Sequence, residues 1–205
     1  MLFVSDNHYF ASSPEGPLVT REISVTLNGN KTTVLTAGGV FSPEHIDQGT
    51  QVLLTHIESA NPTGTFLDVG CGWGPIALAL ALQSPKATIY AIDVNERSIQ
   101  LTKMNAEKLG ISNIITCKPD EVPQHILFDE IWSNPPIRVG KKVLHEILNL
   151  WLKKLVIGGT ARLVVQKNLG SDSLHKWLVD EFDSGYESTR IDSSKTFRVL
   201  KVSKH

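Results

Sequence analysis

The chain has 205 residues, of which 41% are hydrophobic and 20% are charged. This composition is typical of a globular protein with one buried core, and it excludes a disordered or fibrous chain. The formal net charge of -1 excludes a strongly basic field over the whole molecule, which counts against a purely electrostatic hold on nucleic acid.

The first fifty residues have the pattern of an extension. Residues 22–27 and 31–37 are strand-like, and the Asn28-Gly29-Asn30 turn between them predicts a β-hairpin. A helix is predicted over residues 48–60, before Asn61-Pro62. We therefore expect residues 1–50 to form an N-terminal β-hairpin extension packed on a catalytic domain of residues 51–205.

From residue 65 onward, strand and helix patterns alternate. Strands are predicted at residues 65–69, 88–93, 113–117, 128–134 and 161–166, with helices at 75–83, 96–109, 143–157 and 173–182. This alternation predicts an α/β fold with a parallel sheet covered by helices on both faces. Two further strand-like runs, 187–191 and 196–201, are joined by a short turn, so one of them must run antiparallel.

No segment has the pattern of a leader peptide or a membrane span. The first five residues are not a basic region followed by an apolar stretch, and no apolar run approaches the roughly 20 residues that a bilayer requires. Cys71 and Cys117 have neither the number of a disulfide framework nor the spacing of a zinc site, and the histidines show no metal-ligand spacing. We expect a cytoplasmic protein with no membrane partner and no bound metal.

A glycine-rich loop, Asp-Val-Gly-Cys-Gly-Trp-Gly at residues 68–74, lies between the first predicted strand of the alternating region and its helix. Glycine allows a tight turn and a close approach of the backbone to a ligand. Pro75 stands where a dinucleotide fingerprint has its third glycine. A helix N-terminus here suits the carboxylate of S-adenosylmethionine and needs no pyrophosphate. A tight connection without a ligand is the alternative interpretation, and Cys71 has no nearby histidine to activate it.

Acidic residues also follow the next two strands. Asp93 ends the second strand, where a carboxylate can accept hydrogen bonds from both ribose hydroxyls of an adenosine. Asp120 follows the third strand, where it could accept a hydrogen bond from the adenine amine. Together with the glycine-rich loop, these acids predict an S-adenosylmethionine site at the carboxyl edge of the sheet.

The fourth predicted strand ends in Asn134-Pro135-Pro136-Ile137 and should lie beside the first. An amine conjugated to a ring or carbonyl is a poor nucleophile, because its lone pair is delocalised. The Asn134 side-chain oxygen can accept one N–H and the Pro135 carbonyl the other, which orients the nitrogen toward a methyl donor. The two prolines hold these acceptors in place. They could instead simply end the strand, and it is the conjunction with the glycine-rich loop that favours catalysis.

These motifs together resemble the small-domain family of class I methyltransferases, whose known members include 16S ribosomal RNA guanine-N2 methyltransferases. The resemblance rests on residues 8–10, 39–42, 47–49, 53–54, 68–74, 93–95 and 134–137. It implies a Rossmann-like, seven-stranded, mostly parallel sheet with an antiparallel last strand, S-adenosylmethionine as cofactor, and ribosomal RNA or the small ribosomal subunit as partner. Many relatives have an aromatic residue where this chain has Ile137, so stacking on a base would be weaker there.

With that resemblance, the predicted site has two parts. The predicted cofactor-binding residues are Asp68, Gly70, Cys71, Gly72, Gly74, Asp93, Val94, Asp120 and Asn134. The predicted catalytic residues are Asn134, Pro135, Pro136 and Ile137. The basic residues Arg138, Lys141 and Lys142 follow directly and could contact phosphates, or they could form a solvated helix start.

The expected activity is methylation of guanine N2 in ribosomal RNA. Three alternatives stay open from the sequence. The same motif serves enzymes that methylate DNA adenine or a protein glutamine amide. An inactive methyltransferase fold could act as a binding module, although the retained motifs argue against it. A nicotinamide oxidoreductase is disfavoured by the missing third glycine.

Overall fold

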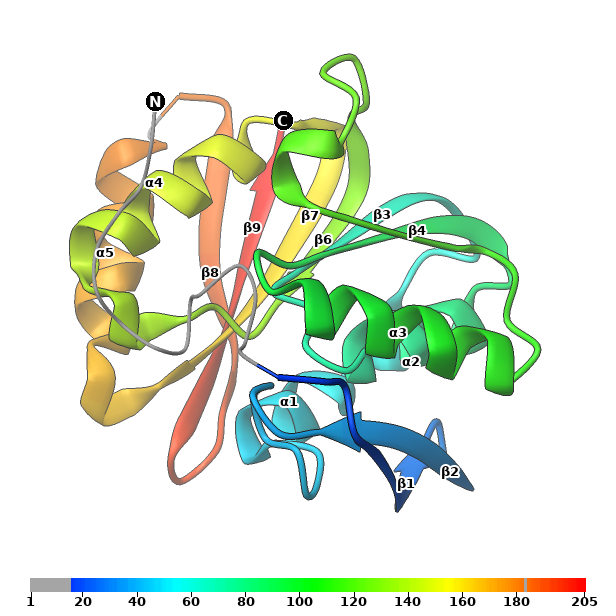
Figure 1. Ribbon diagram of the computed structural model, residues 1–205. Coiled ribbons are helices and arrows are strands. Elements are labelled where there is room, and N and C mark those ends of the chain that lie inside the picture. Colours follow the sequence, from blue (N-terminus) through cyan, green and yellow to red (C-terminus); the bar gives the residue numbers. More distant parts are fainter. Residues whose placement is uncertain (1–15, 183) are drawn as a thin grey trace.

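Seven strands form the central sheet of the computed structural model, which describes residues 16–182 and 184–205 (Figure 1). Across the sheet the strand order is β5-β4-β3-β6-β7-β9-β8. The strands are β3 (Thr63–Val69), β4 (Lys86–Ile92), β5 (Ile114–Cys117), β6 (Phe128–Ser133), β7 (Leu155–Gln166), β8 (Tyr186–Ser193) and β9 (Phe197–Lys204). The motif at residues 8–10 lies outside the described residues.

Strands β3 to β7 pair in parallel, whereas β9 is antiparallel to both β7 and β8. The prediction of a seven-stranded, mostly parallel sheet with an antiparallel last strand is therefore confirmed. β6 lies directly beside β3, with Ser133 opposite Val69. Because parallel strands end at the same edge of a sheet, the loops that follow β3 and β6 emerge side by side, as the sequence predicted.

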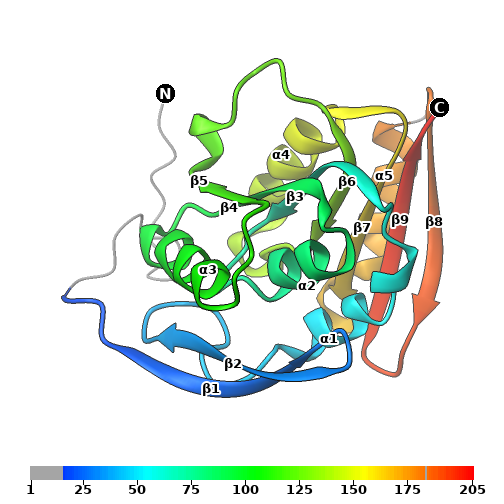
Figure 2. The same cartoon turned by 90° about the vertical axis from the view of Figure 1, so that its right-hand side faces the viewer.

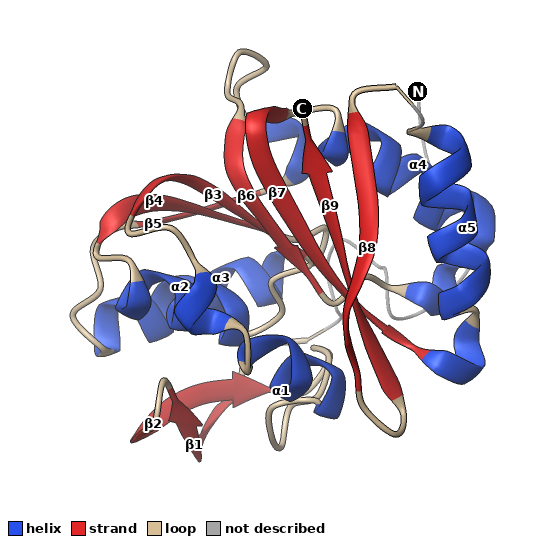
Figure 3. Cartoon of the chain, turned by 180° about the vertical axis from the view of Figure 1, so that it is seen from behind, coloured by secondary structure: helices blue, strands red, loops and turns tan. Residues whose placement is uncertain are grey.

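Helices cover both faces of the sheet (Figure 3). They are α1 (Gln48–Leu54), α2 (Pro75–Gln83), α3 (Glu96–Lys108), α4 (Lys141–Leu152) and α5 (Ser171–Glu181). The first three pack on one face, and α4 and α5 pack on the other. Neighbouring strand residues alternate between the two cores, so Phe66 is buried in one and Leu67 in the other. Each helix in the described part of the chain is too short or too polar to span a bilayer.

The predicted hairpin is present as a separate two-stranded sheet of β1 (Thr20–Leu27) and β2 (Asn30–Ala37). Asn28 and Gly29 both have positive φ, at 47° and 78°, as the tight turn between twisted strands requires. The hairpin passes beneath α2 and α3 (Figure 2), and the Asn28 side chain donates a hydrogen bond to the Ala79 carbonyl at 2.9 Å. The division into an extension and a catalytic domain at residue 50 stays a proposal.

Two predicted helices end earlier in the structure than the sequence pattern indicated. The helix predicted over residues 48–60 is α1 followed by a 3-10 turn, η1 (Ile57–Ser59). The helix predicted over residues 143–157 was wrong at its end, because α4 stops at Leu152 and β7 begins at Leu155. Leu155 is fully buried and pairs with Phe128, so the sheet takes a segment whose apolar residues also fit a helix.

Candidate active site

The glycine-rich loop after β3 is fastened to the end of β4. The backbone N–H groups of Gly70 and Cys71 donate to the Ile92 carbonyl at 2.9 and 3.0 Å, and the N–H of Gly72 donates to Asp93 Oδ2 at 3.0 Å. Gly70 and Gly72 have φ of 81° and 57°, and a Cβ built on either would meet no atom within 4 Å. The backbone of this loop is therefore open to a ligand on the cleft side.

Asp68 lies behind this loop. Its Oδ2 accepts a hydrogen bond from the Ala77 N–H at 3.0 Å, which caps the first turn of α2 from beneath. Oδ1 is buried and has no hydrogen-bond partner among the described residues. Burial raises the pKa of Asp68 to about 8. Asp68 therefore supports the loop and the helix start from the core.

Gly74 and Cys71 pack inside the fold, and only for Gly74 did the sequence give no sign of this role. Gly74 is the residue before α2, at φ 102°, and a Cβ there would lie 3.1 Å from Thr102 of α3. Close packing of two helices explains this glycine. Cys71 is buried, and burial raises the pKa of its thiol well above the ordinary value, so the thiol stays protonated. That protonation agrees with the expectation that Cys71 is no nucleophile.

Asp93 holds two elements together at the end of β4. In addition to the N–H of Gly72, it accepts the Asn95 N–H on Oδ1 at 2.9 Å, beside the start of α3. Burial raises the pKa of Asp93, and these backbone hydrogen bonds oppose that effect. Val94 is 43% exposed, and Asp120 is exposed in the 3-10 turn η2 (Pro119–Glu121) after β5.

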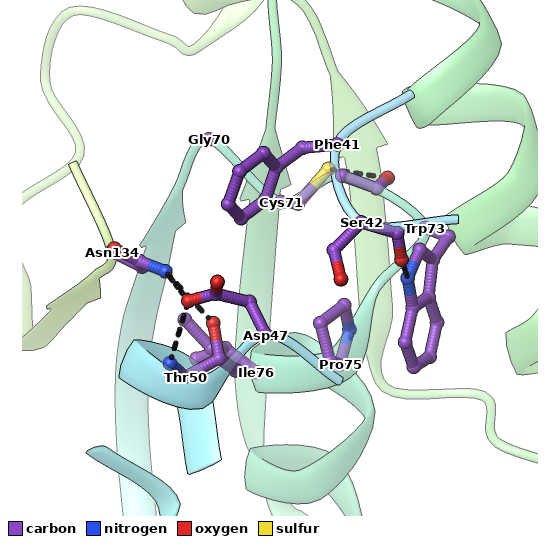
Figure 4. A pocket seen from close by; sticks show the side chains of 11 residues that line it. Phe41, Ser42, Asp47, Thr50, Gly70, Cys71, Trp73, Pro75, Ile76 and Asn134 are labelled. Carbon is purple, nitrogen blue, oxygen red and sulfur yellow. Dashed lines mark hydrogen bonds between the residues drawn. The ribbon is translucent and has the colours of Figure 1, made fainter. Parts of the chain in front are cut away.

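Asn134 lies directly across from the glycine-rich loop. Ser133 donates its hydroxyl hydrogen to the Val69 carbonyl at 2.7 Å, which fastens the end of β6 to the end of β3. The Asn134 side-chain nitrogen donates to Asp47 Oδ2 at 2.8 Å and to Thr50 Oγ1 at 3.1 Å (Figure 4). Both partners belong to the start of α1, a segment for which the sequence motifs predicted no catalytic role.

The other residues of the Asn-Pro-Pro-Ile motif have different surroundings. Pro135 is buried and Pro136 is half-buried before the 3-10 turn η3 (Ile137–Val139). Ile137 packs against the core beneath α4. Among the predicted catalytic residues, only the Asn134 side chain lines the cleft between the loops.

That cleft is narrow, with a volume of about 30 Å³, roughly that of one water molecule in the liquid. Its lining residues are Phe41, Ser42, Asp47, Thr50, Gly70, Cys71, Gly72, Trp73, Pro75, Ile76 and Asn134. The structure thus brings together Gly70, Cys71, Gly72 and Asn134 of the predicted site. It places Asp68, Gly74, Asp93, Val94 and Asp120 outside this lining.

A strap at residues 38–42 forms one wall of the cleft, and sequence reasoning missed its role. Asn95 donates to the Gly39 carbonyl at 2.8 Å, and the Trp73 indole N–H donates to the Ser42 carbonyl at 3.1 Å. Phe41 is 56% exposed although it is a large aromatic side chain that lines the cleft. Residues 39–42 and 47–49 were part of the family resemblance, but the resemblance gave them no function.

Comparison with protein families assigns residues 31–201 to the family described as "Methyltransferase small domain". The chain belongs to this family. Membership confirms the resemblance stated from the sequence motifs. It also agrees with the Rossmann-like sheet and with S-adenosylmethionine as the predicted cofactor. The family match begins inside the hairpin, at the first residues of β2.

Individual family relatives extend this result. YbxB of Bacillus subtilis, described as uncharacterized, is 36% identical over 200 residues, which cover 96% of this chain and 98% of YbxB. Ribosomal RNA small subunit methyltransferase C of Shewanella loihica is 28% identical over 175 residues, which cover 83% of this chain and 46% of that protein.

Among solved structures, the T. thermophilus 16S rRNA N2 methyltransferase RsmC, in complex with AdoMet and guanosine, superposes with a TM-score of 0.79. The two are 24% identical, and the match covers 94% of this chain and 52% of RsmC. The structural likeness shows a shared fold. The chain spans about half the length of the rRNA methyltransferases that it matches.

Proposed function

We propose that this family member is an S-adenosylmethionine-dependent enzyme that methylates an exocyclic nitrogen, namely guanine N2 of ribosomal RNA. One observation carries the proposal. Asn134 and the open backbone of Gly70 and Gly72 line the same cleft, so a hydrogen-bond acceptor for the target amine lies beside a place for the methyl donor. Neither motif alone would distinguish this chemistry from a strand end or a tight turn.

The residues around the cleft fit the cofactor. S-adenosylmethionine, when bound, supplies an electrophilic methyl group on its sulfonium. The backbone of residues 70–72 can approach the cofactor closely, because neither Gly70 nor Gly72 has a side chain that would block it. The Asp93 carboxylate accepts hydrogen bonds from Gly72, Asn95, Ser98 and Val94, and we assign the ribose hydroxyls to this same carboxylate at the end of β4. Val94 and Asp120, exposed at the same edge of the sheet, are assigned to the adenine.

The target amine is oriented by two acceptors. The Asn134 side-chain oxygen and the Pro135 carbonyl each accept one N–H, so the nitrogen lone pair is directed into the cleft. Pro135 and Pro136 have fixed backbones, so this arrangement exists before the substrate binds. With the donor bound, Asn134 and Pro135 would hold the nitrogen toward its methyl group; the methyl–sulfur bond would break as the N–C bond forms, with its electron pair going to the sulfur, and the nitrogen would then lose one proton to solvent.

Ribosomal RNA is favoured by the relatives and by local charge. Two relatives are described as rRNA methyltransferases, and one of them binds guanosine. Lys141 and Lys142 are exposed at the start of α4, a few residues after the catalytic motif. They can neutralise phosphates near the cleft although the whole molecule carries a formal charge of only -1.

The test is transfer of labelled methyl from S-adenosylmethionine to purified ribosomal RNA, assembled small subunits and a protein extract in parallel, followed by nucleoside analysis. We expect N2-methylguanosine in the RNA or the subunits. Label in N6-methyladenine would show that adenine is the substrate, and label only in protein would show that a protein amide is the substrate. Cofactor binding without transfer to any acceptor would favour an inactive binding module and would overturn the proposal.

A further inference from the structure

We propose that Asp47 is a positioning residue for methyl transfer. Its carboxylate holds the Asn134 amide so that the amide oxygen, and not the amide nitrogen, is presented to the substrate. The catalytic meaning of this arrangement rests on the proposed function, whereas the arrangement itself can be tested separately. The hydrogen bonds of one carboxylate oxygen carry the inference.

Asp47 Oδ2 has three donors. It accepts the N–H groups of Gly49 and Thr50, at 2.8 and 3.3 Å, as a capping residue before α1 does. It also accepts Asn134 Nδ2 at 2.8 Å, from a residue 87 positions further along the chain. Helix capping accounts for the first two hydrogen bonds only. The third joins the cap of α1 to the end of β6.

This geometry fixes which end of the amide faces the cleft. An ionised carboxylate can only accept hydrogen bonds, so the Asn134 NH₂ group must face Asp47. Thr50 Oγ1 accepts from the same nitrogen at 3.1 Å, so the Asn134 NH₂ group has two acceptors at the start of α1. No hydrogen bond to Asn134 Oδ1 occurs within the described part of the chain. The oxygen is left as an acceptor on the cleft side.

The opposite orientation would be unproductive for an amine. A flipped amide would present its NH₂ to the NH₂ of the substrate, and two donors cannot form a hydrogen bond with each other. Asp47 therefore selects a substrate that donates N–H over one that presents a carbonyl oxygen. A hydrogen bond to an ionised group is about twice as strong as one between neutral groups, which suits this orienting role.

The position of Asp47 is itself rigid. A Cβ built on Gly49 would lie 3.0 Å from both Asp47 Oδ2 and the ring of Phe197 in β9. Leu53 anchors the other end of α1 with its side chain fully buried. The start of α1 therefore packs between Asp47 and β9, and this packing holds Asp47 in the position from which it orients Asn134.

The experiment compares three variants of the full chain. In Asp47→Ser, serine still caps α1 but is too short to reach Asn134. In Asp47→Asn, the cap and the reach are kept and the charge is lost. Asp129→Ser is the matched control, because the Asp129 carboxylate also accepts a backbone N–H, from Thr65, but lies outside the cleft lining.

The first readout is the side-chain NH₂ signal of Asn134 in an NMR spectrum, assigned by its loss in Asn134→Ala. We expect Asp47→Ser to shift this signal and to speed its exchange with water, and Asp129→Ser to leave it unchanged. The second readout is methyl transfer. Asp47→Ser should lower kcat roughly 10- to 100-fold, with Asp47→Asn between it and wild type and cofactor affinity nearly intact.

A double variant separates positioning from mere structure. If Asp47 acts through Asn134, then Asp47→Ser should cause no further loss of kcat when Asn134 is already alanine. An unchanged Asn134 signal in Asp47→Ser, or effects on kcat that multiply in the double variant, would overturn the inference. If the wild type transfers no methyl to any acceptor but the signal still shifts, the proposed function fails and the positioning of Asn134 by Asp47 stands.

Discussion

At the scale of single residues, Asp93 connects the glycine-rich loop to the start of α3. It accepts the N–H of Gly72 in the glycine-rich loop and that of Asn95 before α3, and we assign the ribose to it as well. Asp93→Ala should weaken S-adenosylmethionine binding by about 1.5 to 3 kcal/mol, the contribution of a hydrogen bond to a charged group. Calorimetric titration measures this change. Unchanged affinity would remove Asp93 from the site.

Asp68 should make the stability of the protein depend on pH. Its folded-state pKa of about 8 is above the unfolded value of about 3.9. The folded state therefore holds an extra proton between about pH 4 and pH 8, so this contribution is complete below pH 4 and is lost as the pH rises through that window. The free energy of unfolding should fall by at most on the order of 1 kcal/mol for each pH unit in this window.

Asp68→Asn tests this dependence, because asparagine keeps an acceptor for the Ala77 N–H and cannot titrate. We expect the variant to lose the decline in unfolding free energy between about pH 5 and pH 8, as followed by urea unfolding at several pH values. The same slope in both proteins would show that another group causes the pH dependence.

Some of these residues could be found from the sequence and others could not. Asn134 and Gly70 stand in short motifs whose chemistry can be interpreted locally. The hydrogen bond between Asp47 and Asn134 joins residues 87 positions apart, so no local pattern encodes it. Nor could composition predict that Gly74 packs against Thr102, because that packing depends on how α3 crosses the start of α2.

At the scale of elements, the proposal that the start of α4 contacts RNA phosphates can be tested by substitution. Replacing Lys141 and Lys142 together by glutamine should weaken RNA binding and lower the slope of log affinity against log salt by about 1 for each phosphate that is no longer neutralised. Cofactor binding should not change. The matched control replaces Lys86 and Lys153, two exposed lysines at the opposite edge of the sheet. Equal weakening by both pairs of substitutions would indicate a general charge effect.

The hairpin depends on one buried side chain of α3. Asn105 is fully buried, exchanges two hydrogen bonds with the backbone of Leu35 in β2, and donates a third to the Trp73 carbonyl. Asn105→Ala should lower the free energy of unfolding by about 1 to 3 kcal/mol for each backbone group that it leaves without a hydrogen bond. Chemical unfolding measures this cost, and faster amide exchange at Leu35 should accompany it. If the unfolding free energy fell but the Leu35 amide exchanged as slowly as in the wild type, Asn105 would not be what holds the hairpin to α3.

Element boundaries were predictable where local signals were strong. Pro75 and the apolar run after it predicted α2 correctly at both ends. The end of α4 was wrong because residues 155–157 are apolar and suit either a helix or a strand, and Ile157 is in fact 79% exposed. Pairing of Leu155 with Phe128 decided the outcome, and such pairing acts over a long range.

At the scale of the whole molecule, alternation of strands and helices was enough to predict the fold class, because each connection follows a simple rule. The sequence also required one antiparallel strand near the end. It did not specify that β9 inserts between β7 and β8, because the order of strands in a sheet depends on long-range pairing that no local pattern encodes. A chain that stops at residue 194 should therefore lose cooperative unfolding, which calorimetry would detect. Cooperative unfolding of that chain would contradict a central role for β9.

The central place of β9 also sets the order of events during protein synthesis. Phe197 packs beside Gly49, so the support for Asp47 and thereby for Asn134 is made by a strand that leaves the ribosome after all other elements of the sheet. Until translation has passed residue 204 and this strand has emerged, the nascent chain can form the glycine-rich loop, but Asp47 and Asn134 lack the support of β9. On the proposed function, the growing chain should therefore gain activity only once β9 is in place.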